Sequence, residues 1–130
     1  QIAAMYAGWV QNHCLVGMSH AIAHQLAKYN IRHGAANGIL MPLVLKYNSQ
    51  DEETLFKYAK ISKRSGVGEN VDDLIRLYDL IRPKLKIPET NFQKSNIDEI
   101  SKNALLDPNA KVNPLNFRKN DVESILLQLK

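Results

Sequence analysis

Three histidines that lie close together in the sequence are the side chains best suited to chemistry in this chain. His20 and His24 are four positions apart, and His33 follows after a short intervening segment. Two imidazoles at this spacing share one face of a helix and can serve a single site. Imidazole binds zinc, iron, copper and nickel, and it also exchanges protons near neutral pH. The cluster therefore predicts a divalent-metal site, or a proton carrier beside one.

The cluster is an incomplete metal site by itself, because three or four protein ligands are usual. Asp51 is the first carboxylate in the chain, so a carboxylate ligand must come from a distant segment or from residues outside this sequence. The alternative interpretation is a non-catalytic helical binding or assembly module whose histidines are structural and bond to carbonyl groups. The spacing alone leaves both interpretations open.

The first expected helix positions two of these histidines. Residues from Ile2 to about Lys28 contain no proline and predict one helix, with a break at Tyr29 and Asn30. On that helix His13 would share a face with His20 and His24. Gly17 would lie on the same stripe, where a glycine lets a ligand or another segment approach the backbone closely.

Helical patterns continue along the rest of the chain. A second helix is expected from His33 to Tyr47, with a kink at Pro42. Ser49-x-x-Glu52 has the pattern of a capping box for a third helix, which Gly66 and Gly68 would end. The buried face of that helix is expected at Leu55, Ala59 and Ser62.

The C-terminal half has the same character. Asn70 can cap a helix that Pro88 would close, and Asn96-x-x-Glu99 opens a short helix through about Leu106. An irregular stretch follows from Asp107 to Arg118. The buried stripes expected on the helix after Asn70 and on the last helix are Val71, Leu74, Ile75, Tyr78 and Ile81, and Val122, Ile125, Leu126 and Leu129.

Composition agrees with one packed domain over residues 1–130. The chain has 130 residues, of which 45% are hydrophobic, and no period-2 pattern predicts a strand. The expected fold class is all-α, a bundle-like domain of six or seven helices. The net charge is +4, but the basic residues are scattered, so we expect no nucleic-acid partner. No apolar run approaches the ~20 residues of a membrane span, so no membrane association is expected.

The ends and the cysteine content bear on the setting of the chain. Cys14 is the only cysteine, which precludes an internal disulfide and fits a cytoplasmic location. Gln1 is not an initiator residue, and the first residues resemble the interior of a helix. We therefore expect the chain to begin inside a larger protein. A truncated helical domain would expose an apolar face, so a homo-oligomer is a possible state.

The segment around the histidines resembles the signature of the iron-dependent (group III) alcohol dehydrogenases. That signature is approximately G-x-x-H-A-x-A-H-x-L-G-G-x-Y-x-I-P-H-G-x-x-N-A-x-L-L-P. The resemblance extends to an approach segment before the signature and to an A-L-x-D…N-P-R…T-x-E-D-I ending after it. Matching positions are Gly17, His20, Ala21, Ala23, His24, Leu26, Tyr29, Ile31, His33, Gly34, Asn37, Leu40 and Pro42, with Ala7, Gly8 and Asn12 before them and Ala104, Leu105, Asp107, Asn113, Pro114, Asp121 and Val122 after them.

The resemblance implies a role for each histidine of the cluster. Enzymes of this family have an N-terminal domain that binds NAD or NADP and a helical C-terminal domain that holds Fe²⁺, or sometimes Zn²⁺, on one aspartate and three histidines. By motif position, His20 and His33 correspond to two metal ligands. His24 corresponds to the histidine beside the metal and the nicotinamide, to which a proton-relay role is assigned. The nucleotide-binding domain and the other two ligands have no counterpart here.

The sequence departs from the signature just before His33. Ala27 and Lys28 replace the Gly-Gly pair, one residue fewer precedes His33, and Arg32 stands where proline is usual. The turn must therefore tighten. His13 replaces a small residue and is expected to have a surface or core role.

The resemblance also implies a function for the parent protein. It would transfer hydride between a small alcohol or aldehyde and NAD or NADP, and it could instead be the alcohol-dehydrogenase end of a bifunctional aldehyde/alcohol dehydrogenase. With two of four ligands and no identified nucleotide-binding residues, the 130-residue chain alone is expected to lack dehydrogenase activity.

Overall fold

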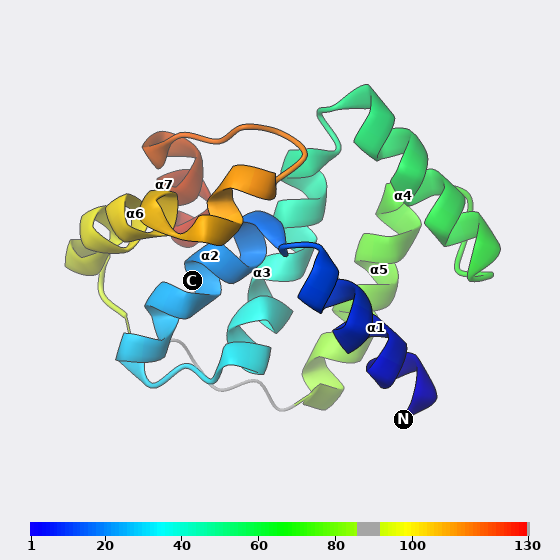
Figure 1. The fold of residues 1–130 in the computed structure, drawn as a ribbon, viewed down its shortest axis with the longest axis horizontal. Helices are drawn as coiled ribbons and strands as arrows, with labels where there is room; N and C mark the ends of the chain where they lie inside the picture. Colours follow the sequence, from blue (N-terminus) through cyan, green and yellow to red (C-terminus); the bar gives the residue numbers. More distant parts are fainter. Residues whose placement is uncertain (86–91, 130) are drawn as a thin grey trace.

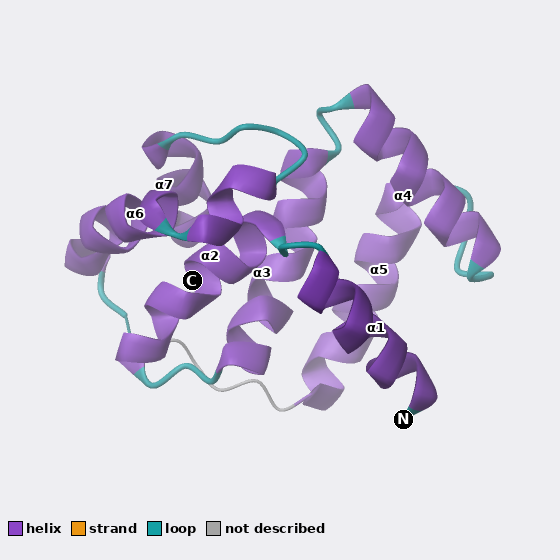
Figure 2. Ribbon diagram, in the orientation of Figure 1, coloured by secondary structure: helices purple, strands orange, loops and turns teal. Residues whose placement is uncertain are grey.

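The computed structural model describes residues 1–85 and 92–129, and within these ranges it contains seven α-helices, four short 3₁₀ segments and no strand (Figures 1 and 2). The all-α fold expected from the sequence is confirmed. The α-helices are α1 (Ile2–His13), α2 (Gly17–Leu26), α3 (His33–Asn48), α4 (Glu52–Arg64), α5 (Val71–Ile81), α6 (Ile97–Leu106) and α7 (Lys119–Leu127). The 3₁₀ segments are η1 (Ala27–Tyr29), η2 (Arg82–Leu85), η3 (Lys94–Asn96) and η4 (Pro108–Val112).

Helix α2 lies at the centre of the core, where it packs against α3, α6 and η4. Its apolar side chains Met18, Ile22 and Leu26 are completely buried. They form one cluster with apolar residues of α3, α6 and α7. Helices α4 and α5 lie on the far side of α3 from α6 and α7 (Figure 1). The central helix of the core is therefore also the helix that carries two of the clustered histidines.

The expected single helix from Ile2 to Lys28 is wrong, because the chain breaks between His13 and Gly17. Cys14 is extended, and Gly17 has a φ of +74°, in the region that favours glycine. The backbone amides of Val16 and Met18 donate to side chains far along the chain, as described below. Because distant side chains bind these two backbone amides, α1 ends before them and α2 begins in a new direction.

Helix α1 buries none of its residues. Trp9 is 64% exposed and Ile2 is 70% exposed, and in Figure 1 the helix projects from the N-terminal end of α2. His13 belongs to this helix and not to α2. Its ring packs against Trp9, and its Nδ1 lies 2.8 Å from the Trp9 carbonyl oxygen. The expected common face of His13 with His20 and His24 is therefore wrong.

The turn before α3 is tight, as expected from the segment before His33, which is one residue shorter than in the family signature. Ala27–Tyr29 form a 3₁₀ turn, and Asn30 adopts the left-handed conformation with φ 59°. Asn tolerates this conformation better than most residues. Helix α3 then begins at His33 and continues through Pro42 to Asn48, which confirms the second expected helix.

The start of α4 differs from the sequence prediction. Asp51 caps this helix by accepting a hydrogen bond from the Thr54 amide, whereas the Ser49 hydroxyl donates to the Lys46 carbonyl. The buried positions of α4 are Thr54 and Ser62, and Leu55 is 40% exposed, so its expected place on a buried face is wrong. Ser62 is buried as expected and Ala59 is half-buried, so only the N-terminal end of the expected face differs, where Thr54 is buried in place of Leu55.

The later helices agree better with their patterns. Gly66 ends α4 with a φ of +71°, and Asn70 caps α5 in a capping box. Of the expected α5 stripe Val71 is buried, Leu74, Ile75 and Tyr78 are half-buried against α3 and α4, and Ile81 is 39% exposed. Asn96 precedes α6 as expected, but its side chain accepts from the Gln93 amide. Pro88 lies outside the described residues. The expected buried residues of the last helix, Val122, Ile125, Leu126 and Leu129, are all buried.

Candidate metal and proton-transfer site

The structure brings the three clustered histidines together. His20 and His24 lie one turn apart on α2, and His33 is the first residue of α3. The ring centres are 4.9 Å apart for His20 and His33, 5.2 Å for His24 and His33, and 6.2 Å for His20 and His24. The tight turn at residues 27–32 therefore returns His33 to the face of α2 that carries the other two.

The surroundings of His20 disfavour its protonation. Partial burial is the main cause that lowers the pKa of His20, and positive charge on His33 or His24 would lower it further, while the Asp107 carboxylate opposes both. A lowered pKa keeps the imidazole of His20 neutral at physiological pH. The neutral ring is the form that binds a metal ion.

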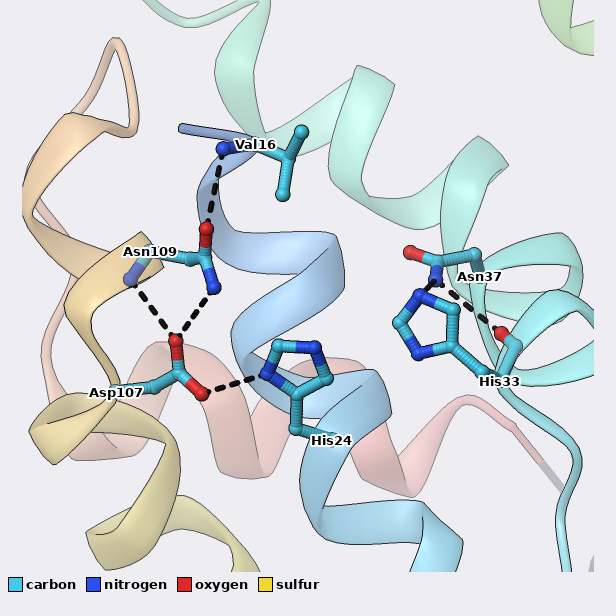
Figure 3. A network of polar contacts seen from close by, with 6 residues as sticks. All are labelled: Val16, His24, His33, Asn37, Asp107 and Asn109. Carbon is cyan, nitrogen blue, oxygen red and sulfur yellow. Dashed lines mark hydrogen bonds and ion pairs between the residues drawn. The ribbon is translucent and has the colours of Figure 1, made fainter. Parts of the chain in front are cut away.

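His24 is anchored from the opposite end of the chain. Its Nδ1 lies 2.8 Å from Oδ2 of Asp107, in the segment that joins α6 to η4. The other carboxylate oxygen of Asp107 accepts from both the backbone amide and the side-chain amide of Asn109 (Figure 3). Asn109 in turn accepts from the Val16 amide at 3.3 Å. These contacts form a continuous polar chain from the start of α2 to the ring of His24.

The Asp107 carboxyl is ionised in this setting. Its partial burial acts to raise its pKa, but the hydrogen bonds from His24 and Asn109 outweigh that effect and leave the pKa below its usual value. The side chain of Asp107 is 10% exposed, whereas that of His24 is 43% exposed. A mostly covered, ionised acceptor thus faces an imidazole that is partly exposed to solvent.

His33 is held by the next turn of its own helix. The Asn37 side-chain nitrogen lies 3.1 Å from His33 Nε2 and donates to the His33 carbonyl at 3.2 Å. The Asn37 side-chain oxygen accepts from the Ser19 hydroxyl of α2 at 2.7 Å (Figure 3 shows the Asn37–His33 contacts). The Ser19–Asn37 bond therefore joins the two helices that carry the cluster.

A buried amide pair fixes the start of α2. The side-chain oxygen of Asn113 accepts from the Met18 amide at 3.0 Å and from the Asn48 side chain at 3.3 Å. The Asn113 side-chain nitrogen donates back to Asn48 at 2.7 Å. Because Asn48 ends α3, this pair connects α2, α3 and the segment after η4 at one point.

An open cavity of about 350 Å³ lies beside His20. Its wall includes Met41, Val44 and Pro114, with Asn48 and Tyr58 as polar groups. Burial raises the pKa of Tyr58, so its hydroxyl stays neutral and can donate a hydrogen bond. The histidine face of α2 therefore adjoins a largely apolar hollow.

The donor set for a metal is partial. Among residues 1–85 and 92–129, no group of three or more His, Cys, Asp or Glu side chains is placed to hold a metal ion. His20 and His33 are the two imidazoles with the closest rings, and the Asp107 carboxylate is directed to His24. The described residues thus supply two adjacent imidazoles and no complete ligand set.

Sequence reasoning identified the histidines but missed the contacts that hold them, and it marked Asp107 only as a match to the family signature. Asp107 and Asn109 are 83 or more positions from their partners on α2, so no local pattern pairs them. Asn37 was marked only as a signature match, although its i+4 spacing from His33 is a signal for contact on one helix. For Asp107 and Asn109, the available sequence signal is the polar Asp-x-Asn motif directly after the apolar stripe of α6.

Over its described residues this chain is an all-helical domain that brings three imidazoles together on α2 and α3. A family model described as "Fe-containing alcohol dehydrogenase family, C-terminal" matches residues 1–129. The chain belongs to this family and corresponds to its C-terminal domain.

Similar proteins of known function are alcohol dehydrogenases. The NADPH-dependent butanol dehydrogenase of Clostridium saccharobutylicum is 35% identical over 119 residues, which are 81% of this chain and 30% of that protein. The 1,3-propanediol dehydrogenase of Citrobacter freundii is 40% identical over 73 residues, covering 55% of this chain and 18% of that protein. The chain therefore spans less than a third of the length of these relatives.

A solved structure of the alcohol dehydrogenase from Oenococcus oeni has a TM-score of 0.80, with 28% identity over 97% of this chain and 36% of that chain. The iron-containing alcohol dehydrogenase of Thermococcus thioreducens has a TM-score of 0.78 at 21% identity, over 88% of this chain and 32% of that chain, and supports the fold. No helix in the described part of this chain is long and apolar enough to cross a membrane.

Proposed function

We propose that this chain is the metal-binding part of an alcohol dehydrogenase that transfers hydride between a small alcohol or aldehyde and NAD or NADP. His20 and His33 would provide two ligands for Fe²⁺ or Zn²⁺, and His24 would carry the proton. The observation that supports this most is the convergence of the three rings, with centres 4.9 to 6.2 Å apart, on two consecutive helices. Family membership is the second support.

A metal ion held by His20 and His33 would supply polarisation of an alcohol oxygen, and a nicotinamide would supply the hydride acceptor. The chain contributes the rest. His20 and His33 orient their imidazoles from rigid helices, which favours a fixed ligand geometry. His24 has an exposed ring edge that can accept a proton, and imidazole is the side chain most often used as a general base. The cavity beside His20 gives an apolar wall for the carbon chain of a small alcohol.

Because the chain covers about 30% of the butanol dehydrogenase, we propose that nucleotide binding and the other metal ligands come from residues beyond these 130. The 130-residue chain alone is then inactive with NAD or NADP and binds metal weakly. Dehydrogenase turnover by the 130-residue chain would contradict this part of the proposal.

The test uses the complete protein that contains this segment. It compares variants in which one histidine at a time is replaced. His20→Ala and His33→Ala should lose most of the bound metal, measured by elemental analysis, with an unchanged circular dichroism spectrum. His24→Ala should keep the metal and lose about 10²-fold or more in kcat. His13→Ala is the matched control, because its ring lies on α1 and contacts Trp9.

The opposite results would favour the structural interpretation of the histidines. In that case His20→Ala would lower the free energy of unfolding strongly and leave metal content at the wild-type level. Full activity of His24→Ala would remove the proton-carrier role while leaving the two ligand assignments intact.

A further inference from the structure

Among residues 1–85 and 92–129, the His24 ring makes its polar contact with Asp107. The Nδ1 atom of His24 and Oδ2 of Asp107 are 2.8 Å apart, although the two residues are 83 positions apart in the sequence. His24 lies in the last turn of α2 with 43% of its side chain exposed, whereas the Asp107 side chain is only 10% exposed. The partly exposed ring thus contacts a carboxylate that is itself mostly covered.

Asp107 is immobilised by contacts that do not involve His24. Its Oδ1 accepts from the Asn109 backbone amide at 2.9 Å and from the Asn109 side-chain nitrogen at 2.8 Å. The Asn109 side-chain oxygen accepts from the Val16 amide at the entrance to α2 (Figure 3). All polar atoms of the Asn109 side chain are therefore used to hold Asp107 against α2, which leaves Oδ2 as the one carboxylate oxygen that faces the imidazole.

The contact determines which nitrogen of the neutral ring carries hydrogen. An ionised carboxylate only accepts, so Nδ1 of His24 must donate, and Nε2 then holds the lone pair. Free histidine prefers the opposite arrangement, with hydrogen on Nε2. The ring of His33 stacks on His24 with centres 5.2 Å apart and planes at 24°, which restricts rotation of the ring away from Asp107.

We propose that Asp107, held in place by Asn109, is the positioning residue that fixes His24 as the Nδ1–H tautomer and presents Nε2 as the proton acceptor. The functional meaning of this inference rests on the proposed proton-carrier role of His24. The tautomer itself does not, because it follows from contacts within this chain. Asp107 acts only through His24 and does not meet the substrate in this assignment.

The primary experiment observes the tautomer directly in the 130-residue chain. Long-range ¹⁵N–¹H correlation spectra at pH 8 report which ring nitrogen is protonated, and a His24→Gln variant assigns the signals. We expect Nδ1–H for His24 in the unmodified chain. In Asp107→Asn the amide keeps an oxygen for Asn109 and turns its NH₂ group toward Nδ1, so His24 should change to Nε2–H. A His24 ring that is Nε2–H in the unmodified chain, or unchanged in Asp107→Asn, would overturn the inference.

Two further variants separate this effect from a loss of fold. Asp107→Ser retains a hydroxyl that can accept from the Asn109 amide but is too short to reach His24, so it should also give Nε2–H. Asp98→Asn removes an exposed carboxylate of α6 that pairs with Lys102 and Lys119 and makes no contact with His24. Its His24 signals should match those of the unmodified chain, and a change there would contradict a specific role for Asp107.

A kinetic measurement on the complete, metal-loaded polypeptide tests the functional meaning. Asp107→Asn should lower kcat by about 10- to 100-fold, the usual range for a residue that orients a functional histidine, with metal content and KM little changed. Unchanged kcat in Asp107→Asn, with His24→Gln inactive, would overturn the positioning role. Unchanged kcat in both variants would instead reject the proton-carrier role of His24, while the spectra would still support the assigned tautomer.

Discussion

The side-chain oxygen of Asn113 lies 3.0 Å from the point where a β-carbon on Gly17 would stand. That oxygen also accepts the Met18 amide hydrogen. Because Gly17 has no side chain, it leaves room for the Asn113 side chain, which binds the first turn of α2.

Gly17→Ala should therefore destabilise the fold. The added methyl group meets Asn113, and alanine is strained at a φ of +74°, so we expect a loss of about 1–3 kcal/mol in the free energy of unfolding. Urea denaturation measures it. Gly8→Ala is the matched control: nothing lies within 4 Å of that position in α1, and alanine there should be neutral or stabilising by up to about 1 kcal/mol. Equal effects of the two substitutions would contradict this account.

Asn113→Ala should be more costly than an average polar substitution. It removes the acceptor of the Met18 amide and leaves the buried Asn48 side chain without two of its bonds. Buried groups left unpaired cost about 1–3 kcal/mol each, so we expect a loss of roughly 3 kcal/mol by thermal or urea unfolding. Asn116→Ala, at an exposed position, should change stability by less than about 0.5 kcal/mol. A small effect at Asn113 would mean that water replaces the lost bonds.

Local signals predicted most of the helices, and distant contacts explain the errors. Helices α3, α6 and α7 and the Asn70 cap follow from periodicity and from end-forming residues, which act within a few positions. The break before Gly17 could not be read locally, because its partners Asn109 and Asn113 are 93 and 95 positions away. In α4, the first helical turn follows Asp51 and not the Ser-x-x-Glu pattern, since Ser49 bonds to the preceding helix.

The same limit applies to the site. The spacing of His20 and His24 predicted a shared face, and their ring centres are 6.2 Å apart on α2. The return of His33 depended on the length of the turn, which the sequence also indicated. The carboxylate at His24 lay beyond prediction from spacing, because the approach of η4 to α2 is a property of the whole packed core. The chemistry of the three histidines could thus be predicted from the sequence, whereas the distant contacts that hold them in place could not.

Removing the side chain of Asp51 tests the observed cap of α4. Asp51 accepts from the Thr54 backbone amide at 2.8 Å and from its hydroxyl at 2.6 Å. Asp51→Ala should lower the free energy of unfolding by about 1 kcal/mol, as is usual for a lost N-cap. Ser49→Ala removes only a bond to the Lys46 carbonyl and should have a smaller effect. The reverse order in denaturation experiments would restore the Ser49 capping box expected from the sequence.

Stability should depend on Asp98 in acid. Hydrogen bonds from Lys102 and Lys119 lower the pKa of Asp98 to about 2 from the ordinary 3.8. A carboxyl whose pKa is lower in the folded state stabilises the fold above the ordinary pKa, and this contribution is lost as the pH falls from about 4 to 2. Asp98→Asn should therefore be less stable than the unmodified chain at pH 6, and most of this difference should be lost by pH 2.

Salt provides the control for this effect. All three side chains of the Asp98 group are at least one-third exposed, so the difference at pH 6 should shrink at 1 M salt. Thermal unfolding followed by circular dichroism across the pH range measures both effects. A difference that persists at pH 2 would assign the loss to packing and not to charge.

The attachment of α2 to the segment around η4 also sets the order in which the parts of the site can assemble. Joining Met18 to Asn113 closes a loop of 95 positions, at an entropic cost of about 4 kcal/mol that no single hydrogen bond offsets. The packing of α2 on α6 must therefore precede or accompany it. During synthesis the histidines leave the ribosome long before Asp107 does. Until that residue has emerged and the core has closed, the imidazole of His24 is free to take either tautomer, and its orientation is among the last features of the fold to be established.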